Sequence, residues 1–121
     1  MAVRFHRRQE VVRWVMSEAV LRARKTVVER VLHGPAATSG DLRRAAFDNL
    51  GVPGRTQLFI DKVARHAYRV TDEDVTAAQA AGASDDELFE LAICAALGQS
   101  TRQLEAALAV IELVPDAKPR R

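Results

Sequence analysis

The sequence predicts an all-α fold of about five helices, with long first and last helices. Apolar residues recur at spacings of three and four, and no useful run of alternating apolar and polar residues appears. Aliphatic residues supply nearly all of the 48% hydrophobic content, aromatics make up 5%, and glycine and proline are sparse at 6 and 4. The 121 residues are expected to form one domain over residues 1–115, followed by a flexible tail over 116–121.

The first predicted helix runs from Val3 to Leu32, because this stretch lacks glycine and proline and keeps one apolar face. Gly34 suits a left-handed C-cap, and Pro35 cannot continue the helix. Such a helix would be about 45 Å long, whereas a compact body of this size is about 35 Å across. Part of it is therefore expected to overhang and to need a partner.

Three shorter helices follow. Ser39 can cap a helix through about Asn49, and a further helix is expected over about Thr56 to Arg69. The inward residues of these two are predicted to be Leu42, Ala45, Ala46 and Leu50, then Leu58 or Phe59, Val63, Ala67 and Val70. Thr71 can cap the next helix, with Asp74 in a variant of the capping box, and Gly82 ends it.

The last predicted helix begins at a capping box, Ser84 to Glu87, and ends at Pro115. Its apolar run, Leu88 to Leu97, is expected to be the most buried part of the chain. Cys94 lies in the middle of that run, where a thiol acts as a small hydrophobe, and the alternative is a reactive thiol near His66. Gly98 indicates either the close approach of another helix or a kink.

The segment Val70 to Leu91, VTDEDVTAAQAAGASDDELFEL, resembles the carboxymuconolactone decarboxylase family, which includes the AhpD-type alkylhydroperoxidases. The shared sequence pattern is a helix ending in Ala-Ala-Gly, then a small residue and Ser, then acidic residues that cap a long apolar helix. The likeness spans about Phe59 to Glu112. It implies an all-α domain that assembles as dimers, trimers or hexamers.

The peroxidase branch of that family carries a C-x-x-C-x-x-x-H motif before the Ala-Ala-Gly. Counting back from Gly82, its two cysteines would fall at Ala67 and Val70 and its histidine at Asp74, so none of the three is present. The branch's proton-relay glutamate has no evident counterpart either. Since a peroxidatic cycle needs one thiol to attack and a second to resolve the sulfenic acid, the resemblance implies the fold without that chemistry.

The helix that would have carried the motif holds the candidate site residues. His66 and Tyr68 are the candidates for catalysis, and Arg65 and Arg69, four residues apart, are the candidates for binding a carboxylate. The alternative is a solvated basic face with one partly buried histidine.

Charge and cysteine content exclude several classes of protein. The one cysteine cannot form an intramolecular disulfide or a cysteine-based zinc site, which fits a cytoplasmic location. His6 and His33 are isolated, so neither a metal site nor another cofactor is expected. The net charge is +2, and glutamates interrupt the basic first helix, so no nucleic-acid partner is expected. No stretch is apolar enough for a membrane span.

The sequence thus predicts a non-redox member of this family, structural or small-molecule-binding, that forms a homo-oligomer through its long helices. Trp14, Val28 and Leu32 are the expected interface residues. The rival hypothesis is a cysteine-independent, decarboxylase-like enzyme acting on a small organic acid. A third is an accessory subunit of a cysteine-bearing relative.

Overall fold

The computed structural model describes residues 17–113, and within that range it is helical and contains no strand. The predicted all-α fold is confirmed. The helices are α2 (Glu18–His33), α3 (Gly40–Asp48), α4 (Thr56–His66), α5 (Asp72–Ala80) and α6 (Asp85–Leu113), with a 3₁₀ turn, η1 (Ala67–Arg69), after α4. None of them is long and apolar enough to cross a membrane.

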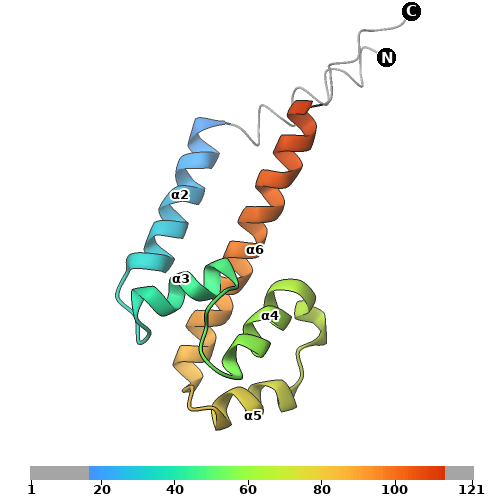
Figure 1. Ribbon diagram of the computed structural model, residues 1–121. Helices are drawn as coiled ribbons and strands as arrows, with labels where there is room; N and C mark the ends of the chain where they lie inside the picture. The colour runs from blue at the N-terminus through green and yellow to red at the C-terminus, as the bar shows by residue number, and fades with distance from the viewer. Residues whose placement is uncertain (1–16, 114–121) are drawn as a thin grey trace, which may run out of the picture.

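Helix α6 is the axis of the molecule (Figure 1). Helix α2 runs beside it in the opposite direction, while α3, α4 and α5 gather around the half of α6 that comes first in the chain. With 29 residues, α6 is about 43 Å long. Its second half therefore extends beyond the three shorter helices, with α2 as its neighbour among the described elements.

The predicted continuous first helix is interrupted at Ser17. That residue has extended backbone angles (φ −61°, ψ 140°), and its hydroxyl accepts a hydrogen bond from the Val20 amide at 3.3 Å. A serine that satisfies a free amide of the first turn starts a helix rather than continuing one, and Glu18 adds a favourable charge there. Helix α2 has 16 residues and is about 24 Å long; residues 3–16 lie outside the described range, as does the predicted tail.

Gly34 ends α2, but not in the predicted left-handed conformation. Its φ of −70° and ψ of 170° are extended, and its amide donates to the carbonyl oxygen of Arg30 at 2.9 Å. A Cβ atom at this position would lie 2.5 Å from that same oxygen. Glycine is therefore needed here for close approach to the helix end.

The other predicted helix starts are confirmed. The Ser39 hydroxyl accepts from the Leu42 amide at 3.1 Å at the start of α3. Ser84 and Glu87 form a reciprocal capping box at the start of α6, with donor to acceptor distances of 3.1 and 3.2 Å.

Helix α4 is shorter than predicted. It ends at His66, whose φ of −144° and ψ of 53° are not helical, and the remaining residues to Arg69 form η1. The chain must become extended at Val70 and Thr71 to enter the cap of α5, and this change of direction ends the α-helix early.

The core lies on the first half of α6. Its buried residues there are Leu88, Leu91, Cys94, Ala95 and Gly98, and they meet apolar residues from every other described α-helix. Phe59 rather than Leu58 is the inward residue of α4. Leu50, predicted to face inward, is instead 77% exposed, because α3 ends at Asp48 and Asn49 turns the chain in the left-handed region.

Gly98 marks the crossing of α3 and α6. A Cβ atom at this position would lie 1.8 Å from the carbonyl oxygen of Phe47, so only glycine lets the two backbones approach this closely. Arg102, one turn further on, donates to the same oxygen at 2.6 Å. Because α6 is one unbroken helix, the close-packing interpretation of Gly98 is confirmed over the kink.

Candidate functional site

The four residues selected from the sequence lie at the end of α4 and in η1, and all four are exposed. The His66 and Tyr68 rings meet edge to face with centroids 6.1 Å apart, and the Arg69 guanidinium lies 5.5 Å from the centroid of the Tyr68 ring. Arg65 turns away to pair with Asp61 at 2.9 Å. Since the α-helix ends at His66, Arg65 and Arg69 do not share a helix face, and His66, Tyr68 and Arg69 form an exposed surface group.

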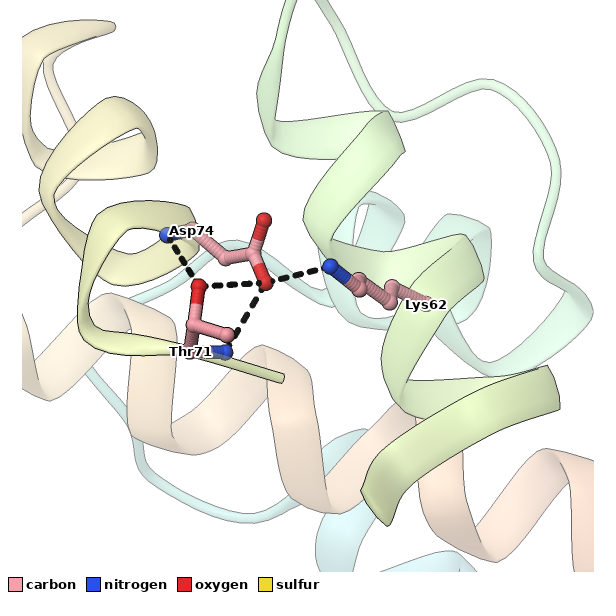
Figure 2. A network of polar contacts seen from close by, with 3 residues as sticks. All are labelled: Lys62, Thr71 and Asp74. Carbon is pink, nitrogen blue, oxygen red and sulfur yellow. Dashed lines mark hydrogen bonds and ion pairs between the residues drawn. The ribbon is translucent and has the colours of Figure 1, made fainter. Parts of the chain in front are cut away.

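Asp74, which stands where the resemblance would place the histidine, belongs to a structural network with Thr71 and Lys62 (Figure 2). Asp74 Oδ2 accepts from the Thr71 amide at 2.9 Å and the Thr71 hydroxyl at 3.1 Å, and the Asp74 amide donates back to that hydroxyl at 3.3 Å. Lys62 from α4 donates to the same Oδ2 at 2.7 Å. The hydrogen bond from Lys62, followed by that from the Thr71 amide, lowers the pKa of Asp74. This arrangement caps α5 and joins it to α4.

Cys94 is a core residue, as expected. Its side chain is 1% exposed, and burial raises the pKa of its thiol above the ordinary value. A neutral buried thiol is a poor nucleophile. His66 is not among the residues around the hollow that Cys94 lines, so the structure does not support the reactive-thiol alternative.

That hollow, of about 170 Å³, lies between the end of α2, the α2–α3 loop and α6. Its lining combines apolar residues, two arginines, one carboxylate and the thiol: Val31, Pro35, Ala36, Ile93, Arg30, Arg43, Glu90 and Cys94. No local pattern in the sequence predicts this site, because its charged members come from three separate segments.

Glu90 holds the α2–α3 loop against α6. Its carboxylate accepts from the Ala37 amide at 2.7 Å, the Thr38 amide at 2.9 Å and the Thr38 hydroxyl at 2.7 Å. These bonds, that from the Thr38 hydroxyl first, lower the pKa of Glu90. The negative charge is thus compensated by donors of the loop.

Arg43 is a buried cation, with 7% of its surface exposed. Its Nη1 donates to the carbonyl oxygens of Val31 at 2.8 Å and Gly34 at 2.9 Å, which satisfies acceptors at the end of α2. Its Nε is also buried and has no hydrogen-bond partner within residues 17–113. The position of Arg43 in the sequence could have indicated its burial. It precedes the buried Ala46 and Phe47 by three and four residues, so it lies on the inward face of α3.

The hollow can bind better than it can catalyse. The thiol is protonated, Glu90 is occupied by three donors, and no cluster of three metal-binding side chains occurs in the described part of the chain. A second hollow, of about 190 Å³ between the α3–α4 loop and the start of α6, has Glu87 as its one ionisable lining residue, and Glu87 caps α6. Of these two hollows, the one beside Cys94 is the candidate site, because it holds a buried arginine.

Comparison of the chain with protein-family models, with curated proteins and with solved structures finds no match.

Proposed function

We propose that this protein is a non-redox, small-molecule-binding protein that assembles as a homo-oligomer and is related to the carboxymuconolactone decarboxylase family. The observation that carries the proposal is the hollow beside Cys94. It places a buried arginine next to apolar side chains, and its thiol is protonated. Binding sites for small molecules combine such apolar walls with a few polar groups.

The absence of redox chemistry follows from the cysteine content together with burial. A peroxidatic cycle needs a thiolate and a resolving thiol, whereas the chain has a single cysteine and that cysteine is in the core. The position of the family's histidine holds Asp74, which is occupied in capping α5.

Assembly is supported by the second half of α6. Val110 and Leu113 are 60% and 81% exposed there, and Leu21 and Val27 of α2 are also exposed. Figure 1 shows this end of the helix pair rising away from α3, α4 and α5. Exposed apolar side chains gathered on two adjacent helices favour association.

A peroxide-consumption assay coupled to a thiol reductant tests the non-redox part of the proposal. We expect no turnover above the rate without protein. Turnover that disappears in Cys94→Ala would contradict the proposal. Labelling of the folded protein with a bulky thiol reagent is the second measurement, and we expect modification of Cys94 to occur only as the protein unfolds.

A further inference from the structure

We infer that the hollow beside Cys94 binds a small aromatic or aliphatic monocarboxylate, with the carboxylate on Arg30 and Arg43 and the apolar body against Val31, Pro35 and Ile93. This inference rests on the proposed binding function and names the ligand class. It concerns a different place from the exposed group at His66 and Tyr68.

The state of the Arg43 guanidinium points to an anionic ligand. A buried Nε–H without an acceptor is an unfavourable feature of a folded protein, since an unmade hydrogen bond to a buried donor costs free energy. Arg43 is fixed by two backbone carbonyl oxygens through its Nη1, so the cation is held in place before any ligand arrives. A preorganised guanidinium that lines a hollow is suited to a carboxylate.

The charges around the hollow also favour an anionic ligand. The hollow is lined by two cations, Arg30 and Arg43, and by one anion, Glu90. Glu90 already accepts three hydrogen bonds from the loop, so its charge is directed to Ala37 and Thr38. The formal charges of these three side chains sum to +1, which a monoanion neutralises.

The size and polarity of the hollow favour a ligand with an apolar body. The hollow measures about 170 Å³, and a cavity of about 150 Å³ is known to hold one benzene molecule. Apart from the charged groups, the lining side chains are apolar or the neutral thiol of Cys94. One ring or a short aliphatic chain with a carboxylate fits both the space and the lining.

Benzoate is the probe, and its neutral amide, benzamide, is the matched control ligand of the same shape. The experiment titrates each into the full chain and follows the amide signals of the α2–α3 loop and of α6 around Cys94 by NMR. We expect benzoate to shift these signals in a saturable way and benzamide to bind at least about tenfold more weakly, because one charge-assisted hydrogen bond is worth about that factor.

Arg30→Gln is the test variant, because Arg30 is exposed and its loss leaves the bonds of Arg43 intact. Arg22→Gln is the control: Arg22 lies on the same helix, carries the same charge and pairs with Glu18 at 2.7 Å. We expect the first variant to weaken benzoate binding about tenfold and the second to leave it unchanged. Circular dichroism checks that both variants keep their helices.

Equal binding of benzoate and benzamide in this hollow would overturn the carboxylate assignment while leaving small-molecule binding in place. Phosphate that displaces benzoate at equal concentration would overturn the role of the apolar wall. Benzoate shifts at Tyr68 and Arg69 instead of the α2–α3 loop would place the anion at the surface group and overturn the assignment to this hollow.

Discussion

At the level of single residues, the Cys94 side chain contributes to the stability of the core. It belongs to the core at the edge of the hollow, so replacing it with alanine removes buried contacts, and we expect the free energy of unfolding to fall by about 1 to 2 kcal/mol. Cys94→Asp should cost considerably more, because it buries a carboxylate without a partner. Urea denaturation of the two variants measures both effects, and equal stability of the aspartate variant and the native protein would contradict the core role.

Glu90 provides a second test at the level of one residue. Glu90→Gln removes the charge that three donors of the α2–α3 loop share, so the loop should open more often. We expect proteolytic cleavage between Gly34 and Ser39 to become about tenfold faster, the factor for losing one charge-assisted hydrogen bond. Glu105→Gln, at an exposed position of the same helix, is the control and should not change the cleavage rate.

Single side chains were predictable from the sequence where local pattern decides their burial, and not where distant segments do. Cys94 follows from the apolar run around it. Leu50 was predicted to face inward because the helical period was continued two residues beyond Asp48, where α3 ends. Arg43 was missed because periodicity treats every arginine as an exposed residue, whereas this one is buried by the end of α2.

At the level of helices, Asp74 links the start of α5 to α4, and its lowered pKa gives a pH dependence. Because the folded-state pKa lies below the unfolded value of about 3.9, Asp74 contributes stability that is present above that value and is lost as pH falls through the folded pKa. We expect Asp74→Asn to lower the melting temperature at pH 7, and this difference to shrink below about pH 4.

Asp72→Asn is the control for that measurement, because Asp72 occupies the same first turn of α5 and is exposed. Its effect on the melting temperature should be small at both pH values. A difference between Asp74→Asn and the native protein that persists undiminished at pH 2 would contradict the assigned role of the ionised carboxylate.

The crossing of α3 and α6 depends on Gly98. Gly98→Ala would place a methyl group against the carbonyl oxygen of Phe47, and neither backbone can move without disturbing the core. We expect a loss of about 2 kcal/mol or more, even though alanine favours a helix by about 1 kcal/mol. Gly40→Ala is the control, since its Cβ would find nothing closer than 3.9 Å, and calorimetry should show it unchanged or slightly stabilised.

Most helix boundaries were predictable because capping is local. At three helix starts, the hydroxyl of the cap residue accepts a hydrogen bond from the amide three residues later: Ser39, Thr71 and Ser84. Two boundaries were not. Ser17 stands in a long run without glycine or proline, and only its bond to Val20 reveals the start of α2. The α-helix of α4 ends at His66 because the chain must turn there to reach the start of α5. The spacing of apolar residues within α4 carries no information about that turn.

At the level of the whole molecule, the homo-oligomer remains a prediction with revised contact residues. Leu32, an expected interface residue, is 2% exposed and belongs to the subunit's own core, while Trp14 lies outside the described range. Val28 is half-buried against that core. Arg24 donates hydrogen bonds to the hydroxyls of Ser100 and Thr101 of its own α6, at 3.2 and 2.7 Å. The exposed residues of the second half of α6 therefore replace them as the expected contact.

Light scattering at micromolar concentration should give a multiple of the 13.3 kDa chain mass. Val110→Glu should shift the mass toward one chain, because symmetry places a carboxylate at each copy of the contact. Leu50→Glu, at another exposed apolar residue, in the α3–α4 loop, is the control and should keep the native mass. A native mass of one chain with the helices fully formed would refute the assembly.

The position of the core along α6 also sets how the molecule opens. All buried residues of α6 lie between Leu88 and Gly98, so amide protons there can exchange with solvent only when the whole domain unfolds. Toward Leu113 the helix has fewer neighbours within residues 17–113, and its amides should exchange through local fraying. In the isolated subunit, protection should therefore decline steadily along α6. Assembly through the second half would raise protection at that end with increasing protein concentration.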